Sequence, residues 1–111
     1  MSTIELTQDN HDEAVSDGIV LIDFWATWCG PCRAFGPIFE ASSEANADIK
    51  HTTVDTDQQQ ELAAKYGIRS IPTLAIYKDG VLVFSQAGAL AAPALADLIT
   101  QVKTLDVSDK K

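Results

Sequence analysis

Both cysteines of the chain, Cys29 and Cys32, lie in the segment Trp28-Cys29-Gly30-Pro31-Cys32. Two cysteines separated by two residues are typical of a thiol–disulfide redox site, above all where a strand passes into a helix. A disulfide between them would close a very small loop, and such a loop constrains the unfolded chain little. We therefore expect this pair to perform redox chemistry rather than to stabilise the fold.

Other chemistries find less support in the sequence. A zinc site usually takes about four ligands, and only His11 and His51 could join the cysteines; both histidines are isolated, and we expect them at the surface. Arg33 follows Cys32, so the haem-attachment pattern is missing. The chain has no phosphate loop or dinucleotide fingerprint. We expect no bound metal or cofactor, and any nicotinamide chemistry would belong to a partner.

Size and charge narrow the function classes. The chain has 111 residues, of which 46% are hydrophobic, so we expect a single domain over residues 1–111 with a short polar tail from about residue 106. The net charge of −8 disfavours nucleic acid and anionic membranes as partners. No stretch approaches membrane-spanning length, and the N-terminus lacks the pattern of a secretory signal. These features predict a cytoplasmic protein.

The hydrophobic pattern predicts the element order β-α-β-α-β-α-β-β-α. Alternating strands and helices followed by a hairpin imply an α/β fold, with a central mixed sheet and helices on both faces. The expected strands are residues 3–6, 20–26, 49–54, 73–77 and 81–84; the expected helices begin near residues 10, 32, 59 and 93.

Turn and cap residues refine these expectations. A capping box at residues 10–13 would open the first helix, and Asp57 could cap the third, which Gly67 would end. Pro37 should kink the second helix. The pair Asp79-Gly80 predicts the turn of a hairpin. The buried face of the last helix is expected to comprise Leu95, Leu98, Ile99, Val102 and Leu105.

These features together resemble the thioredoxin family over nearly the whole chain. The resemblance rests on the run DFWATWCGPC at residues 23–32, the run YGIRSIPT at residues 66–73, and Gly80 and Gly88. A pair of cysteines at this spacing would alone be a weak signal, whereas the long run combined with Ser-Ile-Pro-Thr and the element order is highly specific. The resemblance implies the thioredoxin fold.

The resemblance also implies roles for the cysteines, which would form the redox disulfide. In this family the first cysteine is the nucleophile and the second resolves the mixed disulfide, which assigns Cys29 and Cys32 respectively. A helix start beside Cys29 would stabilise its thiolate. Cys32, one turn inside the helix, is expected to be more buried. Pro31 would fix the backbone of the first turn, and Gly30 would permit a close approach.

Asp23 is the single charged residue of the predicted central strand. It could be a strand-end carboxylate with a local hydrogen bond. By resemblance it instead lies buried behind the cysteines and moves protons for Cys32, and burial would raise its pKa towards neutrality. At the position of Thr53 many thioredoxins carry a lysine, so Asp23 lacks that cationic neighbour here.

The remaining expected site residues form a contact surface for substrate. Pro72 could be an ordinary turn proline, but the resemblance implies a cis-proline that faces the disulfide. The backbone of Ile71 would then pair with an extended substrate segment. Trp28, Gly88 and Ala89 would complete the surface around Cys29. From the residues alone, Trp28 could equally be core and Gly88 a bulge residue.

The expected function is that of a monomeric dithiol carrier that reduces protein disulfides. Thioredoxin reductase would recharge it, so that NADPH is used only indirectly. The Gly-Pro dipeptide between the cysteines is the main indication of direction, because oxidases and isomerases of this fold usually carry a histidine before the second cysteine. Two alternatives stay open: a thiol oxidase or isomerase, and a binding subunit that uses the fold as a scaffold.

Overall fold

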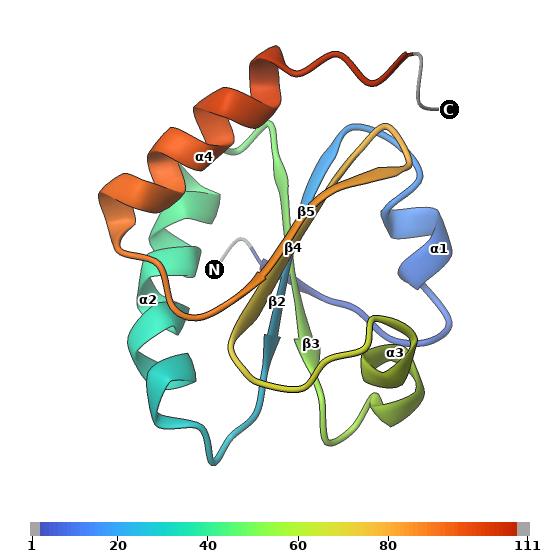
Figure 1. Cartoon of the computed structure of the whole chain (residues 1–111), viewed down its shortest axis with the longest axis vertical. Helices are drawn as coiled ribbons and strands as arrows, with labels where there is room; N and C mark the ends of the chain where they lie inside the picture. Colours follow the sequence, from blue (N-terminus) through green and yellow to red (C-terminus); the bar gives the residue numbers. More distant parts are fainter. Residues whose placement is uncertain (1–2, 109–111) are drawn as a thin grey trace.

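A computed structural model describes residues 3–108 of the chain. It contains a five-stranded mixed sheet in the order β1-β3-β2-β4-β5 (Figure 1). The strands are β1 (Thr3–Glu5), β2 (Ile19–Trp25), β3 (Lys50–Asp55), β4 (Thr73–Lys78) and β5 (Val81–Ala87). The helices are α1 (His11–Ala14), α2 (Gly30–Ala45), α3 (Gln60–Lys65) and α4 (Ala92–Thr104).

The predicted element order and mixed sheet are confirmed, with shifted boundaries. β3 runs parallel to both β1 and β2, whereas β4 runs antiparallel to β2 and β5. β5 extends to Ala87, beyond the predicted end, and α2 begins at Gly30, before the predicted start at Cys32. The structure does not describe Met1 and Ser2, which begin the N-terminal segment that lacks a secretory-signal pattern. Residues 109–111, the end of the expected polar tail, also lie outside the described residues. Within residues 3–108, the helices are all too short or too polar to cross a membrane.

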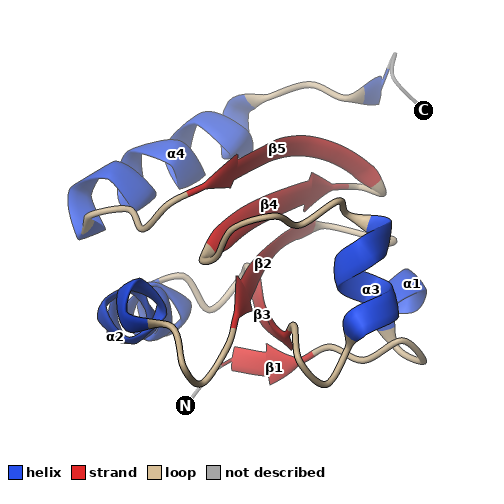
Figure 2. Cartoon of the chain, turned by 60° about the horizontal axis from the view of Figure 1, so that its bottom comes forward, coloured by secondary structure: helices blue, strands red, loops and turns tan. Residues whose placement is uncertain are grey.

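Alternation along β2 divides its side chains between two cores. Val20, Ile22 and Phe24 point into a core that also contains Leu62 of α3. Leu21 points to the opposite face, where a second core holds side chains of α2 and α4. Figure 2 shows α2 and α4 on one side of the sheet and α1 and α3 on the other. Asp23, two residues after Leu21, therefore faces α2.

The two histidines are buried, so the expectation of surface positions was wrong. His11 is 3% exposed and His51 is 1% exposed. His11 contacts the hydroxyl of Tyr66 through Nε2, and the Nε2 of His51 lies 2.9 Å from the Oγ of Ser42. Hydrogen-bonding partners make the burial of an imidazole tolerable. Burial also lowers the pKa of His51, which favours its neutral form.

Three local expectations at helix ends were also wrong. The side chain of Asn10 caps no helical N–H group; its Oδ1 instead accepts a hydrogen bond from the backbone of Thr7. Asp57 does not cap α3, whose N-cap is Gln59. Leu105 lies just beyond the last turn of α4 and is 40% exposed, because the chain leaves the helix before this residue can join the buried face.

Lys78 caps the C-terminal end of α4 from β4. Its Nζ donates hydrogen bonds to the carbonyl oxygens of Val102 at 2.7 Å, Lys103 at 3.0 Å and Leu105. We expect Lys78→Met to lower the free energy of unfolding by about 1–3 kcal/mol in urea titrations, because these carbonyls lose charged donors. Lys103→Met is the control: its Nζ makes an exposed ion pair with Asp48, and its loss should cost about 0.5 kcal/mol or less. Equal losses in both variants would contradict the capping role.

Candidate active site

The cysteine pair occupies the start of α2. Cys29 is the N-cap residue, and its Sγ accepts a hydrogen bond from the backbone N–H of Cys32 at 3.2 Å. The two cysteines form a disulfide with a Cα–Cα distance of 5.2 Å. Gly30 and Pro31, the first residues of the helix, are exposed. This geometry places Cys29 where the free N–H groups and dipole of a helix N-terminus favour negative charge.

The two cysteines are almost equally shielded from solvent. Cys29 is 3% exposed and Cys32 is 5% exposed, so the expectation that Cys32 is the more buried was wrong. Both pack with Ala26, and partly buried Trp25 and Ile71 lie against them. The disulfide ties the two sulfur atoms together, so the same neighbouring side chains cover both.

The loop before β4 lies against Cys29. The Ile71–Pro72 peptide bond is cis, as the resemblance implies. The carbonyl oxygen of Ile71 lies 3.6 Å from the Sγ of Cys29. On the other side of the loop, the N–H of Gly88 donates a hydrogen bond of 2.8 Å to the carbonyl oxygen of Pro72. Gly88 has a φ of 112°, and Ala89 after it is exposed. The structure thus brings Cys29, Ile71, Pro72 and Gly88 together.

Trp28 is a surface residue and not part of the core. It is 65% exposed, and its indole Nε1–H donates a hydrogen bond of 2.9 Å to Oδ2 of Asp57. Together with Ile71 and α3 it lines a pocket of about 570 Å³. Asp57 was not expected as a site residue, because no local sequence pattern indicates its contact with the indole of Trp28.

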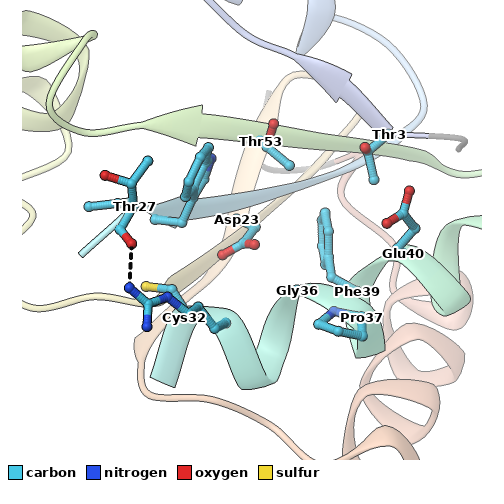
Figure 3. Close-up of a pocket in the computed structure, with 12 residues that line it drawn as sticks. Thr3, Asp23, Thr27, Cys32, Gly36, Pro37, Phe39, Glu40 and Thr53 are labelled. Carbon is cyan, nitrogen blue, oxygen red and sulfur yellow. Dashed lines mark hydrogen bonds between the residues drawn. The ribbon is translucent and has the colours of Figure 1, made fainter. Parts of the chain in front are cut away.

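Asp23 lies behind the cysteines, in the space between the sheet and α2. Figure 3 shows its carboxyl group near Cys32, in a pocket of about 490 Å³. The side chain is 4% exposed, and its Oδ1 has no hydrogen-bonding partner among residues 3–108. Thr53 is its neighbour on β3 and also lines the pocket. Burial raises the pKa of Asp23 to about 7. The carboxyl group can therefore exchange a proton near neutral pH.

The arrangement offers a disulfide and a proton-exchanging acid, and little that could hold a metal. Residues 3–108 contain no group of three or more histidine, cysteine, aspartate or glutamate side chains placed to bind a metal ion. The chemistry that the described site supports is disulfide exchange at Cys29 and Cys32, with Asp23 as the adjacent acid or base.

Comparisons with known proteins agree with this geometry. The thioredoxin family model matches residues 2–101 of the chain. The protein named "Putative thioredoxin 2" of Streptomyces coelicolor is 53% identical over 109 residues, which cover 97% of this chain and 81% of that protein. The thioredoxin of Bacillus subtilis is 39% identical over 102 residues, which cover 91% of this chain and 98% of that protein.

The chain belongs to the thioredoxin family. Its fold is the thioredoxin fold, since the structure of a thioredoxin from Malassezia sympodialis matches it with a TM-score of 0.80 and 36% sequence identity, covering 91% of this chain and 93% of that one. Thioredoxin family proteins are protein-disulfide oxidoreductases. The chain is accordingly a dithiol thiol–disulfide oxidoreductase whose redox-active pair is Cys29 and Cys32.

Proposed function

We propose that the chain reduces protein disulfides by a two-step exchange in which Cys29 attacks and Cys32 resolves. The observation that carries this proposal is the position of Cys29 at the N-terminus of α2, beside the Ile71–Pro72 loop. In the reduced chain, the Cys29 thiolate attacks one sulfur of a client disulfide. A Cys29–client bond forms, the client disulfide breaks, and its other sulfur leaves as a thiolate.

Cys32 completes the exchange from within the helix. Its thiolate attacks the Sγ of Cys29, the Cys29–Cys32 disulfide forms, and the second client sulfur leaves as a thiolate. The client gains two electrons, and its two thiolates take up protons. Because the backbone of α2 holds the two cysteines with a Cα–Cα distance of 5.2 Å, this second attack is intramolecular and favoured by proximity.

Two features of the site prepare these sulfur atoms for their roles. The N–H of Cys32, which donates to the Sγ of Cys29, would stabilise a thiolate there together with the helix dipole. Asp23 accepts the proton that Cys32 must lose before it attacks. A carboxyl group with a pKa of about 7 is suited to this task, because it is partly ionised at neutral pH.

The surface around Cys29 receives the client. Backbone groups of Ile71 pair with an extended segment of the client, as in strand addition. Trp28, whose indole donates a hydrogen bond to Asp57, lines a pocket with Ile71, and Gly88 and Ala89 would extend the contact surface beyond Pro72. Gly30 and Pro31 are exposed at the start of α2, so a client can approach Cys29 closely.

The proposed exchange reaction requires two kinds of partner, an electron donor and proteins with disulfides. We propose that a thioredoxin reductase returns electrons to the disulfide, with NADPH consumed by the reductase and not bound by this chain. The clients are proteins with accessible disulfides. We further propose that the chain acts as a monomer in the cytoplasm, with residues 1–111 as a single domain.

A coupled assay tests this function directly. With NADPH and a bacterial thioredoxin reductase, the chain should sustain NADPH oxidation and insulin reduction at a rate proportional to its concentration. The rate should fall to background when Cys29 is replaced by serine, because the thiolate that attacks the client disulfide is then missing. Insulin reduction that needs neither cysteine would contradict the proposal, and a chain that only oxidises dithiols would indicate an oxidase.

A further inference from the structure

Two residues that line one pocket between α2 and the sheet each have a buried carboxylate oxygen to which the described part of the chain gives no hydrogen-bonding partner. The two oxygens are Oδ1 of Asp23 on β2 and Oε1 of Glu40 on α2. Figure 3 shows both side chains among the residues that line this pocket of about 490 Å³. Buried polar atoms normally have a partner, so two such oxygens in one pocket point to a bound group that supplies donors.

The described lining of the pocket is more acidic than basic, with two carboxyl groups and one guanidinium group. Its one basic lining residue is Arg33, whose Nη2 donates a hydrogen bond of 3.0 Å to the carbonyl oxygen of Thr27. Thr3 and Thr53 add hydroxyl groups to the lining. An ionised Asp23 is costly in such a place unless a cation lies beside it. The net charge of −8 also attracts small cations to the chain.

The other residues that line the pocket indicate which kind of cation it could bind. Trp25, Pro37 and Phe39 give the pocket an apolar wall, which would not suit a strongly hydrated metal ion. Residues 3–108 also lack a cluster of three metal-ligating side chains. A primary ammonium group has three donors for separated acceptors, and a short alkyl chain would cover the apolar wall.

We propose that this pocket binds a primary alkylammonium ion, with its charged group at the carboxylate of Asp23 and its alkyl chain along Trp25, Pro37 and Phe39. Glu40 adds negative charge to the same pocket and strengthens the attraction. Binding is coupled to the ionisation of Asp23, because the ammonium ion favours the charged carboxylate. By linkage, the ligand lowers the pKa of Asp23, and its affinity rises as the pH rises.

The test is an NMR titration of the oxidised chain with propylammonium chloride. Because this titration does not measure disulfide reduction, a negative result would not contradict the proposed redox function. The backbone amides of Gly36 and Thr53 should shift saturably at about pH 8 and much less at about pH 5, where Asp23 is protonated. The carboxyl carbon of Asp23 should titrate about one pH unit lower or more in the presence of saturating ligand. Potassium chloride and tetramethylammonium chloride at equal ionic strength are the controls.

Variants at two positions locate the binding site. Thr53→Lys places an ammonium group on β3 beside Asp23 and should abolish binding, whereas Thr53→Val should retain it. Glu40→Gln should weaken the affinity for propylammonium a few-fold. This variant provides a second test of the proposal if Thr53→Lys fails to fold. The proposal would be overturned by binding that survives in folded Thr53→Lys, by equal shifts with either control salt, or by an Asp23 titration that propylammonium does not move.

Discussion

Replacement of Cys32 by serine is expected to leave the chain able to attack a client disulfide but unable to release the client. Cys29 keeps its place at the start of α2, so its thiolate still forms the mixed disulfide. The serine hydroxyl cannot take the place of the resolving thiolate. The variant should accumulate a covalent adduct with oxidised client, and catalytic turnover should fall to background.

Replacement of Cys29 by serine should have a different outcome. With the attacking sulfur gone, neither turnover nor adduct is expected. Non-reducing mass spectrometry of both variants, each mixed with an oxidised protein substrate, separates the two roles, and the double-serine variant serves as the blank. An adduct that forms with Cys29→Ser and not with Cys32→Ser would reverse the assignment.

Asp23→Ala is expected to stabilise the fold at neutral and higher pH while it slows disulfide reduction. The pKa of Asp23 rises from 3.8 to about 7 on folding, so the native chain binds more protons than the unfolded chain between these values. The free energy of unfolding therefore falls as the pH rises from about 4 to above 7. At about 1.36 kcal/mol per pKa unit, the loss is at most about 4 kcal/mol.

The alanine variant should lack this pH-dependent loss. Urea titrations of the oxidised chain across the pH range measure it, and Asp17→Ala, at an exposed position, controls for the change in net charge. The turnover of Asp23→Ala, expressed relative to the wild type, should also be lowest at the pH values at which the wild-type carboxylate is ionised and can take the proton of Cys32. A destabilised variant with normal turnover would show that Asp23 has neither role.

The elements that position the cysteines could be predicted from the sequence because their signals are local. The apolar run of β2 and the turn at Asp79-Gly80 can each be recognised from a few consecutive residues. Positive φ angles at both turn residues, 50° at Asp79 and 84° at Gly80, agree with the predicted hairpin. The burial of Asp23 was predicted through the resemblance to the thioredoxin family, and it agrees with a strand whose two faces are both covered.

The features that the sequence did not reveal depend on contacts between distant residues. His51 is buried against Phe39 of α2, where Ser42 of the same helix lies within hydrogen-bonding distance of its ring, and no local pattern indicates these contacts. Asp57 resembles a helix cap, but the indole of Trp28 takes its carboxylate instead. No signal in the sequence indicated Glu40, one of whose oxygens is buried, and which lines the same pocket as Asp23.

The reduction potential of the Cys29–Cys32 couple decides whether the chain acts as a disulfide reductant or as an oxidant. Equilibration of the chain with glutathione buffers of defined ratio, followed by thiol alkylation and mass spectrometry, gives the fraction that is reduced. We expect a strongly reducing couple, near the established thioredoxin value of about −270 mV, because Gly-Pro puts no cation between the cysteines. A potential near about −120 mV, typical of a dithiol oxidase, would contradict it.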